Sequence, residues 1–277
     1  MKGIKNLLKG GAQIIIKIYN TIIWFVFQTI HYGFKNRLEK PKENELITIL
    51  GNGPSLREDI NKIDFGKGQF CVVNYFLDSS LFNSLKPQYY LLADPVFFQS
   101  ETMIESIVEK VHWEMQLFVP YIIWKKRFKK RTFEWLKIIP YNDYSYQGFK
   151  CVKFWLYKKG WSMPTPQNVL VPSLFNAINM GYKEIRLYGA DHSWTKSLCV
   201  TKDNVVCAID SHFYDNKVSI NPYWKGREGC YYKLYEFFRD LSKTFESYHQ
   251  IREYAERVGS RIINCTEDSF IDAFDKV

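Results

Sequence analysis

Short apolar runs of strand length recur along this chain, and helix-compatible segments separate them. The runs are LITILG (46–51), FCVVNYF (70–76), YYLLADP (89–95), EIRLYGADHS (184–193) and RIINCT (261–266). Strands that alternate with helices are typical of parallel sheets, because the crossover helices cover both faces of the sheet. The sequence therefore predicts an α/β fold with a single, largely parallel sheet and helices on both faces.

The first four runs end in polar residues, which are Asn52, Asn74, Asp94, and Asp191 with His192. The carboxyl ends of parallel strands meet at one edge of a sheet, and ligands of open α/β proteins bind beyond that edge. We therefore expect these side chains to converge on a ligand. Asn and Asp after a strand also cap helices or form turns, and this alternative stays open for Asp94 and Asp191.

The first run leads into a glycine-rich loop, Gly51-Asn52-Gly53-Pro54-Ser55. Its two glycines allow the backbone to approach a ligand closely, and its serine stands at a possible helix cap. Phosphate or ribose would suit such a loop. The loop has neither the spacing of a dinucleotide fingerprint nor the lysine of a P-loop, so by itself it does not identify the ligand.

The N-terminal segment is rich in Ile and Phe from residue 12 to residue 32, but polar residues interrupt it, which makes it a poor membrane-spanning helix. The polar positions recur every three or four residues and form one stripe on a helix: Lys5, Lys9, Gln13, Lys17, Asn20 or Thr21, Trp24, Gln28 and His31. A mostly apolar helix with a narrow basic stripe is typical of segments that lie in the headgroup region of a bilayer. The alternative is a helix that packs on the protein's own core or on a partner subunit.

Length and charge limit the domain organisation and the partners. A chain of 277 residues is long for one domain and short for two, so we expect a membrane-associating helix and linker in residues 1–40 and one catalytic domain in residues 41–277.

The net charge of +9 suits phosphate-bearing substrates, anionic lipid or nucleic acid. Nucleic acid is not expected, because the chain has no recognisable RNA or DNA module. The six cysteines have no zinc-site spacing and favour a reduced, cytosolic setting.

Residues 112–163 are the most cationic and aromatic part of the chain and are interpreted as an insertion in the catalytic domain. Their cations could contact a lipid-linked diphosphate or an anionic membrane, which would make the insertion a lid or an acceptor platform. An equally good interpretation is a solvated basic helix face with its aromatic residues in the core. Residues 229–258 carry apolar residues at helical spacing and predict a packing helix that stops at Gly259.

Five strings resemble the bacterial sialyltransferase family that decorates lipooligosaccharides: ILGNGPSL, VVNYF, LADPVFF, NAINMGYKEIRLYGAD and DSHFY. A related group, similar to archaeal hydroxymethylpterin pyrophosphokinases, shares parts of the pattern. The resemblance covers residues 46–214 and implies a GT-A-variant fold and sugar transfer without a metal or other cofactor. It implies that Asn52, Gly53 and Ser55 contact the nucleotide or phosphate of the donor, and that Asn74 contacts its nucleotide or sugar.

The chain departs from the sialyl-transferring members of this family at two places. Asp94 stands where those members have Asn, and a carboxylate beside a carboxylated sugar is repulsive. The resemblance makes a CMP-linked acidic sugar the first expectation for the donor, and the departure at Asp94 keeps a UDP-sugar open as an alternative. The family also has two tyrosines near the leaving phosphate. Ser193 lies where the first is expected, and the second has no clear counterpart.

Sugar transfer requires an acceptor hydroxyl to lose its proton, and imidazole suits this task near neutral pH. Two of the five histidines are candidates, His192 after a strand and His212 in the run DSHFY. His212 falls on the general base of the family and is favoured. The predicted catalytic residues are His212 and His192, together with Asp191, which directly precedes His192 at the strand end.

The function predicted from the sequence is transfer of a sugar from a nucleotide-activated donor to a membrane-linked saccharide, in surface polysaccharide or lipopolysaccharide synthesis. The protein would be peripheral, on the cytoplasmic face of the bacterial inner membrane. Two alternatives stay open, a pyrophosphokinase-like phosphotransfer with Asp94 and Asp191 on magnesium, and a non-catalytic membrane adaptor. Assembly into a homo-oligomer is also left open.

Overall fold

The computed structural model describes residues 2–34, 38–39, 45–212, 215–225 and 229–277. For residues 2–9, 209–212 and 215–219 it describes the backbone alone. The expected linker KPKEN, at residues 40–44, lies outside the described residues.

An eight-stranded sheet forms the centre of the protein, in the order β13-β12-β6-β1-β2-β3-β4-β5. Every pair of neighbours is parallel, which confirms the predicted α/β fold. The strands are β1 (Leu46–Leu50), β2 (Gln69–Val73), β3 (Tyr89–Leu91), β4 (Met115–Pro120), β5 (Leu136–Tyr141), β6 (Glu184–Tyr188), β12 (Arg261–Asn264) and β13 (Asp275–Lys276).

The order in which the chain adds strands to the sheet reverses between β1 and β6. From β1 the chain moves outward through β2, β3, β4 and β5, and it then returns to the other side of β1 as β6. The loops that follow β1 and β6 therefore belong to crossovers on opposite sides, and a crevice forms between them at the carboxyl edge. This switch point is the position at which a ligand site is expected in such a sheet.

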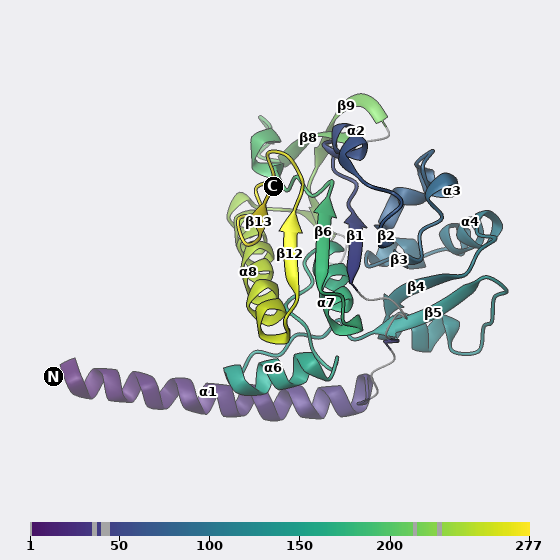
Figure 1. Cartoon of the computed structure of the whole chain (residues 1–277). Coiled ribbons are helices and arrows are strands. Elements are labelled where there is room, and N and C mark those ends of the chain that lie inside the picture. The colour runs from purple at the N-terminus through teal and green to yellow at the C-terminus, as the bar shows by residue number, and fades with distance from the viewer. Residues whose placement is uncertain (1, 35–37, 40–44, 213–214, 226–228) are drawn as a thin grey trace.

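Helices lie on both faces of the sheet (Figure 1), and an apolar core fills each side. One lies under α6 (Lys150–Lys158), α7 (Leu170–Met180) and α8 (Leu234–Val258), and it takes inward-facing strand residues such as Ile47 and Ile49. The other lies under short elements: α2 (Leu56–Asp59), η1 (Ile60–Lys62), η2 (Asn74–Asp78), α3 (Phe82–Leu85), η3 (Pro95–Phe98), α4 (Thr102–Lys110), α5 (Tyr121–Ile123) and the π-helical turn η4 (Trp124–Phe128). The predicted packing helix is confirmed as α8, which ends at Gly259 with φ +74°.

Two parts of the fold differ from the sequence prediction. Residues 112–163 contain β4 and β5 of the central sheet, so this stretch is only partly an insertion. Both strands are six residues long, but their flanks are rich in Trp and Lys, which hid them in the sequence. The chain also forms an antiparallel excursion after η5 (Trp194–Ser197), made of β7 (Leu198–Val200), β8 (Val206–His212) and β9 (Asp215–Pro222), and a small hairpin of β10 (Trp224–Lys225) and β11 (Cys230–Tyr231).

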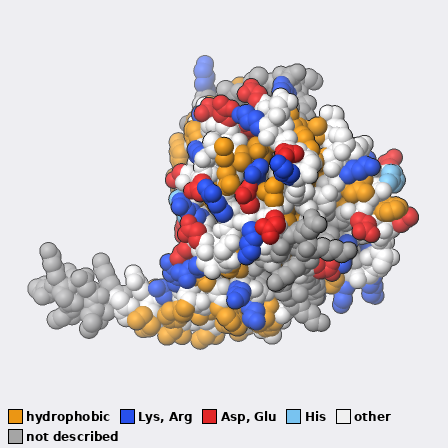
Figure 2. All heavy atoms as spheres, viewed as in Figure 1, with side chains coloured by type: hydrophobic (Ala, Val, Ile, Leu, Met, Phe, Trp, Pro, Cys, Tyr) orange, Lys and Arg blue, Asp and Glu red, His pale blue; other side chains and the backbone are white. Residues whose placement is uncertain are grey.

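The N-terminal helix α1 (Lys2–His31) lies along α6, and β1, β6 and β12 point away from it (Figure 1). From Asn20 to Gln28 its polar stripe faces the protein. Trp24 is 2% exposed and packs against Tyr144 and Tyr146, while the Thr21 hydroxyl lies 2.7 Å from the Tyr146 hydroxyl and Gln28 is fully buried. The apolar side chains of the helix face outward, where they form a row along the lower edge of Figure 2. By length and composition alone, residues 10–31 could cross a membrane.

Trp24 is expected to hold α1 against the body of the protein. Replacing a buried Trp by Ala costs roughly 3–5 kcal/mol, and an undocked helix frays because packing supplies most helical stability. Trp24→Ala should therefore speed hydrogen exchange of the amides of residues 20–31. Ile22→Ala, on the exposed side of the same helix, is the matched control and should leave exchange unchanged. Equal exchange in the two variants would contradict the docked arrangement.

Candidate functional site

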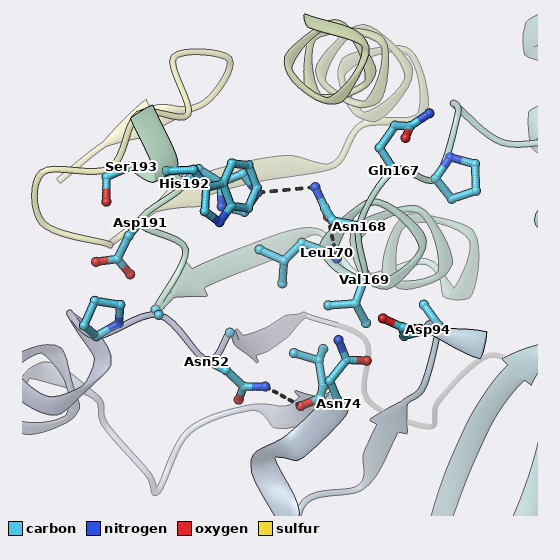
Figure 3. A pocket seen from close by; sticks show the side chains of 18 of the residues that line it. Asn52, Asn74, Asp94, Gln167, Asn168, Val169, Leu170, Asp191, His192 and Ser193 are labelled. Carbon is cyan, nitrogen blue, oxygen red and sulfur yellow. Dashed lines mark hydrogen bonds between the residues drawn. The ribbon is translucent and has the colours of Figure 1, made fainter. Parts of the chain in front are cut away.

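A cavity of about 610 Å³ opens at the switch point of the sheet (Figure 3). The loops after β1, β2, β3 and β6 line it, together with the segment that leads into α7. The structure brings six of the eight predicted site residues together in this cavity: Asn52, Gly53, Asn74, Asp94, Asp191 and His192. The cavity therefore lies where the polar ends of the strands were expected to converge.

Backbone contacts clasp the loop after β1 to the loop after β6. The Gly51 N–H donates to the Tyr188 carbonyl (2.8 Å), and the Gly53 N–H donates to the Gly189 carbonyl (2.9 Å). A Cβ atom at Gly51 would lie 2.3 Å from the Gly189 oxygen, which is far inside contact distance. Gly189 itself has φ +63°, a conformation that side chains disfavour. The sequence needs glycine here because the two loops touch through their backbones.

The Asp191 carboxylate completes this clasp. Its Oδ2 accepts a hydrogen bond from the Ser55 hydroxyl (2.8 Å) and its Oδ1 accepts one from the Ser55 N–H (3.2 Å). A Cβ atom at Gly53 would lie 1.8 Å from Oδ2, so only glycine leaves room for the carboxylate. Burial raises the pKa of Asp191, and the hydrogen bonds from Ser55 oppose that rise. These contacts favour a positioning role for Asp191 over the predicted catalytic role, and they keep Ser55 behind the cavity.

Two amide oxygens at the cavity wall are buried without a partner among the described residues, Oδ1 of Asn52 and Oδ1 of Asn74. Asn52 is held from its other end, because its Nδ2 donates to the Val73 carbonyl at the end of β2 (2.9 Å). Asn74 has φ +46°, which Asn tolerates better than most residues. A buried acceptor without a donor costs free energy, so this pair is poised to accept hydrogen bonds from a ligand.

Asp94 lines the cavity but also caps the next turn. Its Oδ1 accepts a hydrogen bond from the Val96 N–H (3.0 Å), and Pro95 occupies the first position of η3. This capping role is the alternative that the sequence left open. One carboxylate oxygen of Asp94 has this structural partner, and the carboxylate still contributes negative charge to the cavity wall.

His192 is part of a buried network beneath the cavity. Its Nε2 lies 2.6 Å from the Tyr248 hydroxyl and 3.3 Å from Nδ2 of Asn168. Oδ1 of Asn168 accepts hydrogen bonds from the N–H groups of Leu170 and Val171, which orients the amide. The Tyr248 hydroxyl also donates to Oδ1 of Asn168 (3.1 Å), so His192, Tyr248 and Asn168 form one closed hydrogen-bonded network.

Burial lowers the pKa of His192 to about 3, so the ring is neutral near pH 7. A base with so low a pKa removes protons poorly, and Nε2 is already occupied by two partners. These findings argue against the predicted catalytic role of His192. They favour instead a structural role for His192, through its contacts with Asn168 and Tyr248.

Asn168 is the residue that the sequence reasoning missed. It stands just before the apolar run of α7, and an Asn before such a run is a helix-cap signal. Gln167, Trp194 and Lys196 also line the cavity. Trp194 and Lys196 come from η5, which follows directly after Asp191-His192-Ser193, and its position was not predictable from strand periodicity.

His212 belongs to β8 by its backbone, but its side chain lies outside the described part of the protein. The same holds for the side chain of Asp210, and Tyr214 is not described at all. His212 therefore stays a prediction as the general base. None of the described residues that line the cavity comes from 112–163, so the lid or acceptor platform expected there has no support in the geometry.

The described residues contain no group of three His, Cys, Asp or Glu side chains that could hold a metal ion. In the phosphotransfer alternative, Asp94 and Asp191 bind magnesium. Both oxygens of Asp191 accept hydrogen bonds from Ser55, and Oδ1 of Asp94 accepts one from a backbone N–H. These contacts compete with the proposed metal, so the side-chain chemistry does not favour this alternative.

No protein-family model and no curated protein matches the sequence. Among solved structures, the MAf glycosyltransferase from Magnetospirillum magneticum AMB-1 matches 91% of this chain, with a TM-score of 0.51 and 14% sequence identity. The chain spans 36% of the length of that protein. The monofunctional alpha-2,3-sialyltransferase Cst-I from Campylobacter jejuni matches 87% of this chain and 83% of its own length, with a TM-score of 0.45 and 16% identity. At such identities, the first match establishes a shared fold.

Because His192 is neutral in the folded protein, we expect the free energy of unfolding to fall at acidic pH. In the unfolded chain its pKa is about 6.5, whereas burial lowers it to about 3 in the folded protein. Its contribution to stability is therefore complete above about pH 6.5 and is lost as the pH falls from there towards about 3. His192→Asn, which tolerates the positive φ of this position, removes the titrating group.

Urea unfolding at several pH values checks this prediction. Below about pH 6.5 the wild type should lose about 1.4 kcal/mol more stability per pH unit than His192→Asn. Parallel curves of unfolding free energy against pH would contradict a buried neutral histidine.

Proposed function

We propose that this protein is a glycosyltransferase that uses a nucleotide-activated sugar, with the donor bound in the switch-point cavity. The observation that carries the proposal is the pair of buried, unpartnered oxygens of Asn52 and Asn74 beside a loop in which only glycine fits. The cavity volume of about 610 Å³ lies in the range of small-ligand sites. The fold shared with a glycosyltransferase supports the same reaction class.

The donor would contact both backbone and side chains. Ribose hydroxyls or the N–H groups of a base are suitable donors for the two asparagine oxygens. The close backbone approach at Gly51 and Gly53 leaves room for a phosphate next to the loop. Among the described residues that line the cavity, Lys196 is the one cation, and its charge would favour a phosphate.

The sugar of the donor is proposed from the resemblance and from the charge of the wall. A CMP-linked acidic sugar remains the first candidate. Asp94 adds a negative charge to the cavity, and a carboxylate repels a carboxylated sugar. UDP-sugars should therefore be tested as donors beside CMP-linked sugars. The proposed acceptor is a membrane-linked saccharide, in surface polysaccharide or lipopolysaccharide synthesis, on the cytoplasmic face of the bacterial inner membrane.

The chemical step is proposed as attack of an acceptor hydroxyl on the anomeric carbon of the donor. The new glycosidic C–O bond forms as the bond from that carbon to the phosphate oxygen breaks, and the nucleotide leaves with the bonding electrons. The hydroxyl proton passes to His212, which is the proposed general base. His192 is a poorer candidate because of its lowered pKa, and Asp191 holds the donor loop in position.

Donor binding should depend on the absence of a side chain at Gly53. A valine there would collide with Asp191 and Gly189 and displace the loop, so Gly53→Val should abolish nucleotide binding measured by calorimetry. Gly66→Val is the matched control, because a Cβ atom there meets only the Asp64 carboxylate, at 3.4 Å. Circular dichroism checks that both variants fold, and Asn52→Ala gives a second test of the same site. Unchanged binding would make the loop a simple turn.

The general base is tested by His212→Ala, compared with His192→Ala. Loss of a general base typically slows transfer by about 10²- to 10⁴-fold, and donor affinity should hardly change. Transfer should persist in the presence of a chelator, because the proposed mechanism uses no metal. Wild-type turnover of a folded His212→Ala protein would remove His212 from the mechanism. Strict magnesium dependence would instead favour the phosphotransfer alternative.

A further inference from the structure

The outward face of α1 is a continuous apolar surface. Its side chains are between 46% and 68% exposed: Ile14, Ile15, Ile16, Ile18, Tyr19, Ile22, Ile23, Val26 and Ile30. The run from Ile14 to Ile30 is about 25 Å long at the helical rise of 1.5 Å per residue. Scattered exposed apolar residues are normal on soluble proteins, but a contiguous row of this length marks an interaction surface.

The body of the protein fixes which face of α1 points outward. On the inward face, the Asn20 amide donates to the Gln147 carbonyl (2.9 Å) and the Tyr32 hydroxyl donates to the Asp143 carboxylate (2.7 Å). Trp24 and Gln28 are buried between them. The helix cannot turn its polar stripe to solvent without breaking these contacts, so the apolar face is the one available to a partner.

The charged side chains of α1 and α6 are all basic. Residues 1–38 contain no Asp or Glu, and neither do residues 144–183, which include α6. Lys17 of α1 and Lys158 of α6 are exposed, and Lys150 of α6 is exposed but pairs with Glu253 of α8 (2.7 Å). Trp155 of α6 is 47% exposed, and Trp is enriched where proteins meet the headgroup region of a membrane. Apolar, aromatic and basic groups thus occur together on α1 and α6.

We propose that α1 and α6 together bind the surface of an anionic bilayer, with α1 lying in the membrane plane and its apolar face in the boundary between headgroups and acyl chains. An amphipathic helix binds a bilayer in this way through buried apolar area and attraction to anionic lipid. A spanning arrangement would strip residues 20–32 from the body and expose Gln28 to hydrocarbon. A second copy of the chain is a poorer partner, because two basic surfaces repel each other.

This arrangement has a consequence that rests on the proposed function. β1, β6 and β12 point away from α1, so the switch-point cavity opens at the end of the sheet remote from the bilayer (Figure 1). A strand of five residues alone spans about 16 Å. The acceptor end that receives the sugar must therefore stand off the membrane, as the tip of a lipid-carried saccharide chain does.

Flotation with lipid vesicles tests the surface independently of any enzymatic activity. The full-length protein should float with vesicles of equimolar phosphatidylcholine and phosphatidylglycerol, and far less with phosphatidylcholine alone. Ile22→Glu, which places a charge in the apolar row, should lower the partition coefficient by about tenfold or more. Val108→Glu on α4 adds the same charge at an exposed site elsewhere and should float like the wild type. Ile15→Glu, farther from the body, serves if Ile22→Glu fails to fold.

The same samples separate the in-plane arrangement from the two others. A protease-cleavable tag placed before the first residue should be cut by protease added outside sealed vesicles, because an in-plane helix keeps its N-terminus on the side of the body. Protection of the tag would indicate a spanning helix and overturn the proposal. Failure to float, or a lipid-free dimer that Ile22→Glu converts to a monomer, would overturn it as well.

Discussion

The contact between the loops after β1 and β6 is the constraint on which the site depends. Gly51 and Gly53 hydrogen-bond with the backbone of Tyr188 and Gly189, and Asp191 locks this contact through Ser55. The two loops lead to crossovers on opposite sides of the sheet, so their clasp closes the floor of a crevice that the strand order opens. Without glycine at these positions the loops would separate, and the side-chain oxygens of Asn52 and Asn74 would no longer be held at the cavity wall.

The contact between the two loops also gives the polar residues of the site different partners. Asp191 and His192 follow the same strand, yet one binds a loop serine and the other lies neutral under the cavity against Tyr248. Both look catalytic in the sequence. Their burial and their partners favour positioning roles, whereas the side-chain oxygens of Asn52 and Asn74 are buried without a partner among the described residues.

The sequence anticipated the parallel sheet and most of the cavity lining, because strand periodicity and polar strand ends are local signals. It failed where tertiary contacts decide the outcome. Strands β4 and β5 were hidden among Lys and Trp, and Asn168 reaches His192 from a distant segment. The polar stripe on α1 follows one face of the helix, but only docking against Tyr144 and Tyr146 determines that its part around Trp24 points inward. Periodicity defines two faces of a helix and does not say which one meets solvent.

The central claim is that the switch-point cavity holds a nucleotide-activated sugar and that the protein consumes it. The most direct measurement is release of free nucleotide from a panel of CMP-, UDP- and GDP-sugars, with and without chelator, in the presence of a saccharide acceptor. The account predicts that one nucleotide class is consumed, that a chelator does not stop the reaction, and that hydrogen exchange slows at residues 51–55 and 73–74 when that donor is added. Consumption of none of the panel, or protection only at sites remote from these loops, would contradict it.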